Sequence, residues 1–142
     1  MNTDIASLRR PLPALNYDNR AFWTGGQQGD LLIYQCQACQ YLIHPPVRFC
    51  PHCEGRHVLP VPVSGQGIVT SFTVNHKQWL PQLPVPYVVA LVSLVEQEDV
   101  RLVANISDCA VDAVYIGMPV AVYFEQHEDI WVPLFRPVEV QA

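Results

Sequence analysis

Two Cys-x-x-Cys motifs constrain the fold of this chain more than any other feature. They consist of Cys36 with Cys39 and Cys50 with Cys53, separated by the ten residues 40–49. A Cys-x-x-Cys turn presents two sulfurs to one metal ion, and two such turns complete the tetrahedron that zinc prefers. We therefore predict that the four cysteines bind a structural zinc ion. An iron centre of the same geometry, an empty site and a disulfide are the alternatives.

A zinc ion held by four thiolates has no open position for water or substrate, which a catalytic zinc requires. The cluster is therefore predicted to hold the chain in place rather than to perform chemistry. His44, His52 and His57 lie in or near the cluster, but four cysteines already suffice, so no histidine is expected to bind the metal. Cys109 has no partner in the sequence and is expected to be a buried apolar thiol.

Composition indicates a folded protein whose surface is short of charge. Half of the 142 residues are hydrophobic and 15% are charged, against roughly 25% in a typical soluble domain. A partner is therefore expected to cover part of the surface. The formal net charge is -5, and Lys77 is the only lysine, which argues against a surface that neutralises a phosphate backbone.

The N-terminal segment is not expected to act as a secretion signal. Prolines and polar residues interrupt positions 1–23, whereas a signal peptide needs an apolar core of roughly 7 to 15 residues. No run approaches the roughly 18 apolar residues of a transmembrane helix. The expected location is the cytoplasm, where thiols stay reduced and paired cysteines more often bind metal than form disulfides.

Hydrophobic patterning predicts a mainly β chain in three parts. These are an N-terminal helical arm in residues 1–30, a zinc ribbon in residues 31–58 and a barrel in residues 59–142. The arm is expected to contain a short helix from about Asn16 to Trp23, stopped by Gly25 and Gly26.

The third part is predicted to contain five strands, with a proline loop at residues 78–86. The expected strands span residues 61–76, 87–95, 100–106, 119–126 and 130–137. A curled first strand and a longer connection between the third and fourth strands are typical of a five-stranded OB-fold barrel. An SH3-like barrel is the alternative, because strand order cannot be read from one sequence.

Several segments, taken in order, resemble a known family. They are "AFWTGGQQGDLLIYQC", the cysteine cluster, "GQGIVTSFTV", "IGMPV" and "PLFRP". This arrangement is similar to the acyl-CoA-associated OB-fold family, long labelled a domain of unknown function, in which a rubredoxin-like zinc ribbon precedes an OB barrel. The resemblance extends from about Asn16 to Pro137. Members often have glycine after the first pair of cysteines, whereas Gln40 stands there in this chain and would need a left-handed backbone.

The resemblance implies a non-catalytic accessory subunit in acyl-CoA thioester processing. Its partner would be a thiolase-like enzyme, namely an acyltransferase, a thiolase or a steroid side-chain aldolase, and catalysis would belong to that partner. A MaoC-like enoyl-CoA hydratase is the alternative partner. Runs such as "YVVALVSLV" are apolar at both odd and even positions, so both faces of these strands favour burial. The cover would be either a partner or the chain's own helix and ribbon.

Two sets of residues are candidates for these contacts. A proline-stiffened loop presents apolar side chains at low entropic cost, so Trp79, Leu80 and Tyr87 are predicted to bind the partner. If CoA contacts this chain, its phosphates would need cations. The candidate cations are Arg48, Arg56 and Lys77.

Two other functions are open. OB barrels and zinc ribbons also bind nucleic acids, but the acidic, lysine-poor composition removes the electrostatic part of that mechanism. An independent enzyme would need acid-base groups such as His76, His127, Glu128 or Asp129. No spacing ties any of these residues to a nucleophile.

Overall fold

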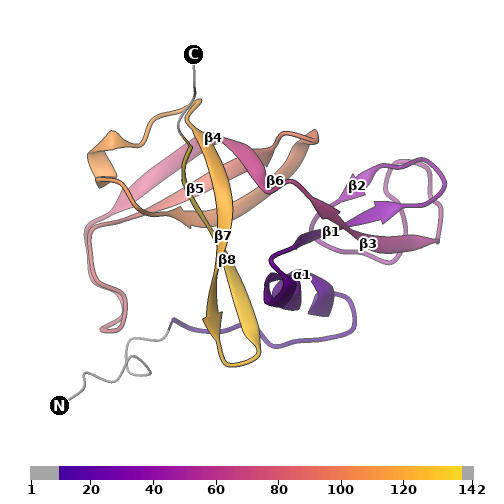
Figure 1. The fold of residues 1–142 in the computed structure, drawn as a ribbon, viewed down its shortest axis with the longest axis horizontal. Helices are drawn as coiled ribbons and strands as arrows, with labels where there is room; N and C mark the ends of the chain where they lie inside the picture. Colours follow the sequence, from indigo (N-terminus) through magenta and orange to yellow (C-terminus); the bar gives the residue numbers. More distant parts are fainter. Residues whose placement is uncertain (1–9, 139–142) are drawn as a thin grey trace.

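We describe residues 10–138 of a computed structural model; the first nine residues of the predicted arm and residues 139–142 lie outside the described part. Figure 1 shows a barrel at one end of the molecule, a small three-stranded sheet at the other, and a short helix between them. The elements, in chain order, are helix α1 (Arg20–Thr24), 3-10 helix η2 (Gly25–Gln28), strands β1 (Leu31–Cys36), β2 (Leu42–Ile43), β3 (Val58–Val63), β4 (Gln66–Asn75), β5 (Tyr87–Leu94) and β6 (Gln97–Ile106), 3-10 helix η3 (Val111–Ala113), and strands β7 (Pro119–His127) and β8 (Ile130–Pro137). None of the helices in residues 10–138 has the length and apolar character that a membrane crossing requires.

Helix α1 begins later than the sequence predicted. The backbone N–H of Asn19 donates to Asn16 Oδ1 at 2.9 Å, and the N–H of Asn16 donates to Asn19 Oδ1 at 2.8 Å. These reciprocal bonds close residues 16–19 into a turn, because asparagine side chains compete with the backbone for helical hydrogen bonds. The α-helix ends at Thr24 with Gly25 as its C-cap, and the chain continues as η2 up to Gly29, whose φ is 81°.

The helical segment packs on the barrel through one aromatic residue and one close glycine contact. Phe22 is buried in the main core. A Cβ atom on Gly26 would lie 2.5 Å from Trp131 Cβ and 2.6 Å from Phe124 Cδ1. Glycine therefore allows η2 to approach the β7–β8 hairpin more closely than any other residue could.

The ribbon sheet has the strand order β2-β1-β3, and all its pairs are antiparallel. Strand β3 contains Pro60 and Pro62, which are tolerated because β3 is an edge strand. The sequence predicted one curled strand over residues 61–76, but the structure divides it between β3 of the ribbon and β4 of the barrel. The break falls at Gly65, whose φ of 78° is incompatible with a continuous strand.

The barrel closes in the order β4-β5-β6-β8-β7. Its strands pair antiparallel except for β6 and β8, which meet in parallel at Ile106 and Phe135. The N–H of Ser107 extends this contact by donating to Phe135 O at 2.9 Å. This Greek-key order with five strands confirms the predicted OB fold and disfavours the SH3-like alternative.

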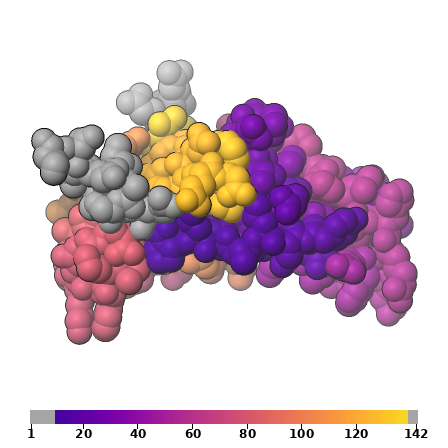
Figure 2. Space-filling model, turned by 90° about the horizontal axis from the view of Figure 1, so that it is seen from below, coloured from indigo at the N-terminus to yellow at the C-terminus, as the bar shows by residue number. Residues whose placement is uncertain are grey.

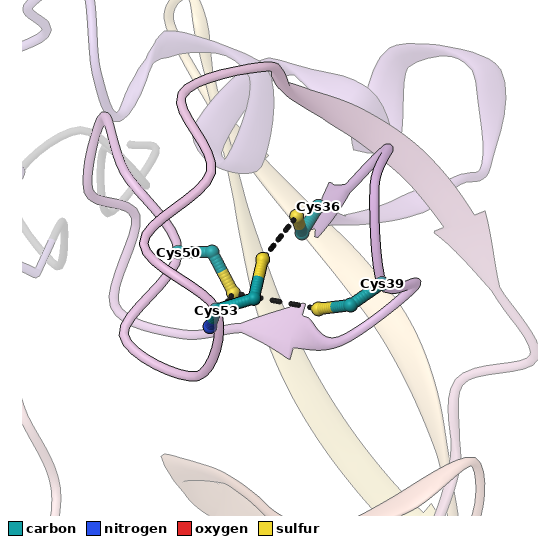
Figure 3. A group of neighbouring side chains, drawn as sticks. All are labelled: Cys36, Cys39, Cys50 and Cys53. Carbon is teal, nitrogen blue, oxygen red and sulfur yellow. Dashed lines mark hydrogen bonds between the residues drawn. The ribbon is translucent and has the colours of Figure 1, made fainter.

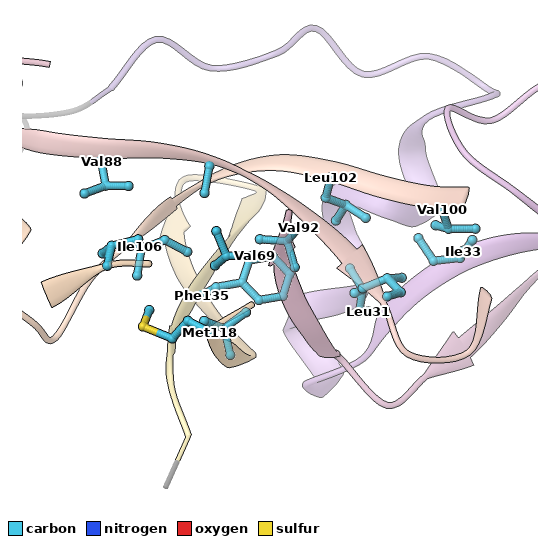
Figure 4. Packing of buried hydrophobic residues seen from close by; sticks show 14 of the residues in the cluster. Leu31, Ile33, Val69, Val88, Val92, Val100, Leu102, Ile106, Met118 and Phe135 are labelled. Atoms are coloured by element: carbon cyan, nitrogen blue, oxygen red, sulfur yellow. The ribbon is translucent and has the colours of Figure 1, made fainter. Parts of the chain in front are cut away.

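The barrel and the ribbon share one hydrophobic core. The main cluster combines barrel residues such as Val92 and Phe135 with Leu31 and Ile33 of β1. Figure 4 shows Leu31 and Ile33 at the end of the cluster that holds Val100. The helix and the ribbon therefore cover part of the barrel's apolar surface.

Candidate metal centre and interaction surfaces

The four cysteines of the two Cys-x-x-Cys motifs converge on one point (Figure 3). Their Sγ atoms all lie within 4.8 Å of one another. Cys36 Sγ lies 3.5 Å from Cys53 Sγ, and Cys39 Sγ lies 3.7 Å from Cys50 Sγ. A tetrahedral zinc ion with Zn–S bonds of about 2.3 Å separates its sulfurs by about 3.8 Å. The donor set and its spacing therefore fit a four-thiolate zinc ion.

Two equivalent turns position these sulfurs. The N–H of Gln40 donates to Cys36 O, and the N–H of Glu54 donates to Cys50 O, each at 2.8 Å. Gln40 and Glu54 have φ values of 70° and 65°, so the predicted left-handed backbone at Gln40 is confirmed. Cys50 Sγ also accepts the backbone N–H of Cys53 at 3.4 Å, which orients this sulfur within the second turn.

Among the described residues, the group able to hold a metal consists of these four cysteines. His52 Nδ1 lies 3.7 Å from Cys39 Sγ, and its ring stacks on Tyr41 at 5.0 Å. His44 packs against Phe22 instead, and burial lowers the pKa of His44. Cys109 is half-buried, and burial raises its thiol pKa, which disfavours a reactive thiolate.

The predicted cationic residues lie in two separate places. Arg48 and Arg56 line one groove between α1 and the ribbon, with a volume of about 950 Å³. Arg20 also lines this groove, and Leu32 and Pro60 contribute apolar surface. The Nε of Arg48 donates to Asp18 Oδ1 at 2.8 Å, and the Arg48 guanidinium lies 5.4 Å from the centre of the Tyr17 ring.

Lys77 directly precedes the proline loop in the connection between β4 and β5, at the opposite end of the molecule from the ribbon (Figure 1). Figure 2 shows this loop projecting from the body of the protein. Trp79 is 65% exposed, and Lys77 Nζ lies 4.2 Å from the centre of its ring. The indole Nε1 donates to Asn75 Oδ1 at 3.2 Å. Leu80 and Tyr87 are half-buried, so the accessible apolar group of this loop is mainly Trp79.

Other exposed apolar residues escaped the sequence analysis. Val103 on β6 is 73% exposed, and Tyr115 and Ile116 in the connection before β7 are 55% and 69% exposed. Val103 also lines a second groove of about 610 Å³, bounded by α1, residues 44–46, β6 and β8. The sequence feature that could have indicated Tyr115 and Ile116 as exposed is that two adjacent apolar residues precede Gly117 in a segment expected to be a connection.

The candidate acid-base group His127 takes part in a structural contact. Its Nε2 lies 2.7 Å from Glu125 Oε1, and the same oxygen accepts from Arg10 Nε at 3.3 Å. Arg10 Nη1 also donates to Asn105 Oδ1 at 2.7 Å. The cluster therefore ties the N-terminal arm to β6 and β7.

The fold and the cysteine cluster together define a zinc-ribbon protein with an OB-fold barrel. Family models agree with both parts: the rubredoxin-like zinc ribbon domain of ChsH2 matches residues 23–59, and the C-terminal OB-fold domain of ChsH2 matches residues 60–125. A solved chain described as "Ltp2-ChsH2(DUF35) aldolase" is 40% identical, with a TM-score of 0.81, and the match covers 89% of this chain and 98% of that chain. The protein belongs to the DUF35 family, in its ChsH2-type branch.

Two relatives of this chain are longer proteins. A "Probable enoyl-CoA hydratase alpha subunit" of Thermomonospora curvata is 41% identical over 133 residues, which are 93% of this chain and 41% of the relative. The "3-oxo-4,17-pregnadiene-20-carboxyl-CoA hydratase alpha subunit" of Mycobacterium tuberculosis is 34% identical over 127 residues, 89% of this chain and 40% of the relative. The chain thus spans about two fifths of the length of each.

Proposed function

We propose that this chain is a non-catalytic accessory module that binds a thiolase-like aldolase and supports the processing of acyl-CoA thioesters. The observation that carries the proposal is the 40% identity to a chain of the Ltp2-ChsH2(DUF35) aldolase over 98% of that chain. At this identity the two chains are expected to present similar surfaces. The partner's thiolase-like character is an expectation from the family resemblance.

The chemistry of the chain supports an accessory role. A metal bound by all four cysteines has a filled coordination sphere, so it cannot activate water or polarise a thioester carbonyl. The metal's contribution, when bound, is to fold the ribbon. The exposed Trp79, Val103 and Ile116 provide apolar surface of the kind that protein interfaces bury.

A MaoC-like enoyl-CoA hydratase subunit is the second candidate partner. It is favoured by the printed names of two relatives, both of which are hydratase alpha subunits. Both candidate partners act on CoA thioesters, so the class of substrate does not distinguish them. A direct comparison of binding to each partner does.

Co-expression provides the test. The chain, carrying an affinity tag, is produced with a thiolase-like aldolase or with a MaoC-like hydratase subunit from the same genome, and each mixture is analysed by affinity purification and size-exclusion chromatography. A stable complex with the aldolase, and thioester cleavage only by that complex, is the expected result. A complex with the hydratase alone would favour the second candidate, and turnover by the isolated chain would overturn the accessory role.

We also propose that Arg48 and Arg56 bind the phosphates of the acyl-CoA at the groove between α1 and the ribbon. Guanidinium groups form strong bidentate hydrogen bonds with phosphates, and the apolar groove wall suits the uncharged part of such a ligand. Lys77 is a separate candidate, because it lies at the other end of the molecule.

Alanine variants in the assembled complex test this assignment. The Arg48→Ala/Arg56→Ala double variant is expected to weaken acyl-CoA binding about tenfold, the factor for about 1.4 kcal/mol. Isothermal titration calorimetry measures the affinity, and Arg136→Ala on β8 is the matched control. If Lys77→Ala weakens binding and the double variant does not, the phosphate site lies at the proline loop instead.

A further inference from the structure

Two side chains at the start of β6 join the barrel to the ribbon. Gln97 Oε1 accepts the backbone N–H of Leu42 at 2.9 Å, and Gln97 Nε2 donates to the carbonyl oxygen of Leu42 at 2.8 Å. The amide therefore satisfies both backbone groups of one residue in β2, as a neighbouring strand would. Gln97 Nε2 also donates to Asp99 Oδ1 at 2.8 Å, which fixes the orientation of both side chains.

Asp99 makes the second contact with the ribbon. Its Oδ2 accepts the hydroxyl of Tyr41 at 2.5 Å. We refer to Gln97 and Asp99 together as the β6 latch. The latch holds two consecutive ribbon residues, Tyr41 and Leu42, and both of its members come from the barrel.

Tyr41 and Leu42 are also connected to the metal centre. The carbonyl oxygen of Tyr41 accepts the N–H of Cys36 at 2.9 Å. The Tyr41 ring stacks on His52, which lies in the second cysteine turn and whose Nδ1 is 3.7 Å from Cys39 Sγ. The residues that the latch holds therefore contact both cysteine turns.

We propose that Gln97 and Asp99 are positioning residues for the metal centre, so that the barrel slows the release of zinc from the ribbon. Zinc ribbons fold together with metal binding. The latch contacts require a folded β2, so they stabilise the metal-bound ribbon and not a metal-free, unfolded one. By thermodynamic linkage, contacts that favour the metal-bound state raise the apparent metal affinity. The proposal does not depend on the identity of the partner enzyme.

Zinc transfer from the full-length, zinc-loaded protein to a chromogenic chelator tests the proposal. Gln97→Ala is expected to increase the transfer rate and the zinc dissociation constant about tenfold, because two hydrogen bonds to Leu42 are lost. Gln126→Ala is the matched control, since Gln126 is exposed on β7 and bonds locally to Glu128 O. Equal zinc release from both variants and the unchanged protein would overturn the proposal.

A general loss of stability would also accelerate zinc release, so a second variant separates the two effects. Ile130→Val weakens the buried start of β8, away from the latch. At a matched decrease in melting temperature, Gln97→Ala is expected to release zinc several-fold faster than Ile130→Val. Equal release rates would overturn the latch. Tyr41→Phe and Asp99→Ala are expected to be non-additive in the same assay, and additive effects would contradict the proposed Tyr41–Asp99 contact.

Discussion

Each turn of the metal centre depends on one residue with a left-handed backbone. These residues are Gln40 and Glu54, and both follow the second cysteine of a pair. A left-handed conformation costs a residue other than glycine about 1–2 kcal/mol. The strain is maintained because the backbone N–H groups of Gln40 and Glu54 must reach the carbonyls of Cys36 and Cys50. A residue that adopts this conformation without strain, such as glycine, is therefore expected to stabilise the protein at either position.

Replacement of Gln40 by glycine is expected to stabilise the protein. Glycine adopts the observed φ of 70° without strain, and the expected gain in unfolding free energy is about 0.5–1 kcal/mol after the greater entropy of the unfolded chain is included. Urea unfolding of the zinc-loaded protein measures the change. Gln37→Gly, in the same turn but without a positive φ, is the control and is expected to be neutral or destabilising. A lower stability for Gln40→Gly would show that its side chain matters more than its backbone.

Replacement of Cys50 by serine is expected to reduce zinc binding and folding together. Structural zinc binding contributes about 10–16 kcal/mol, so the loss of one of four thiolates corresponds to about 3 kcal/mol and a more than 100-fold weaker affinity. Competition with a chelator and thermal unfolding provide the two measurements. Cys109→Ser, outside the cluster, is the control. Unchanged zinc affinity in Cys50→Ser would contradict a four-thiolate centre.

At the scale of elements, the most exposed part of the predicted docking segment is the loop between β4 and β5. The loop contains several prolines, and its exposed indole is fixed by Asn75 and by the cation of Lys77. Fixing the indole before binding reduces the entropy that association would otherwise cost. The loop is thus preorganised to present Trp79.

Replacement of Trp79 by alanine is expected to weaken the complex with the partner by about 2 kcal/mol or more, as for an exposed aromatic anchor. The fold should be unchanged, because the side chain is 65% exposed. Surface plasmon resonance against the partner and circular dichroism of the free chain provide the measurements. Tyr17→Ala, 83% exposed next to α1, is the matched control. If Trp79→Ala binds the partner with the affinity of the unchanged protein, the docking surface lies at Val103 or Ile116 and not at Trp79.

The sequence predicted most elements because their patterns are local. The two strands of the β5–β6 hairpin were predicted from apolar runs in residues 87–95 and 100–106, and the cysteine cluster was predicted from its spacing alone. The division between β3 and β4 was missed because residues 61–76 were interpreted as one curled strand, whereas the positive φ of Gly65 separates two sheets. Gln97 and Asp99 lie between the expected strands 87–95 and 100–106, and nothing in a local pattern indicates that they reach Leu42 and Tyr41.

At the scale of the whole molecule, the N-terminal arm is held to the barrel by charge. Glu125 of β7 interacts with Arg10 and His127. Burial alone would raise the pKa of Glu125, but the hydrogen bond with His127 and the charge of Arg10 outweigh it, so this pKa lies below its usual value. A carboxylate with a lowered pKa stabilises the fold at pH values above its unfolded-state pKa.

This stabilisation is expected to disappear as the pH falls from about 4.3 through the lower pKa of folded Glu125. Because the carboxylate is 42% exposed, solvent screening limits the contribution to about 1 kcal/mol. Glu125→Gln should therefore have a lower unfolding free energy than the unchanged protein at pH 7. The difference in unfolding free energy should vanish at pH values below the pKa of folded Glu125. Urea unfolding as a function of pH measures it, with Glu96→Gln as the control. A difference that is constant with pH would exclude an ionic origin.

The packing of η2 against the β7–β8 hairpin has a consequence for the order in which the chain folds. The ribbon is built from strand pairings within residues 31–63, so we expect it to be able to bind its metal once β3 has been synthesised. Gly26 of η2 precedes the ribbon, yet its packing partners Phe124 and Trp131 lie in the last two strands. Contacts between such distant segments form late and slowly. We therefore expect η2 to lack these contacts beside a folded ribbon during synthesis, until the C-terminal hairpin has been made.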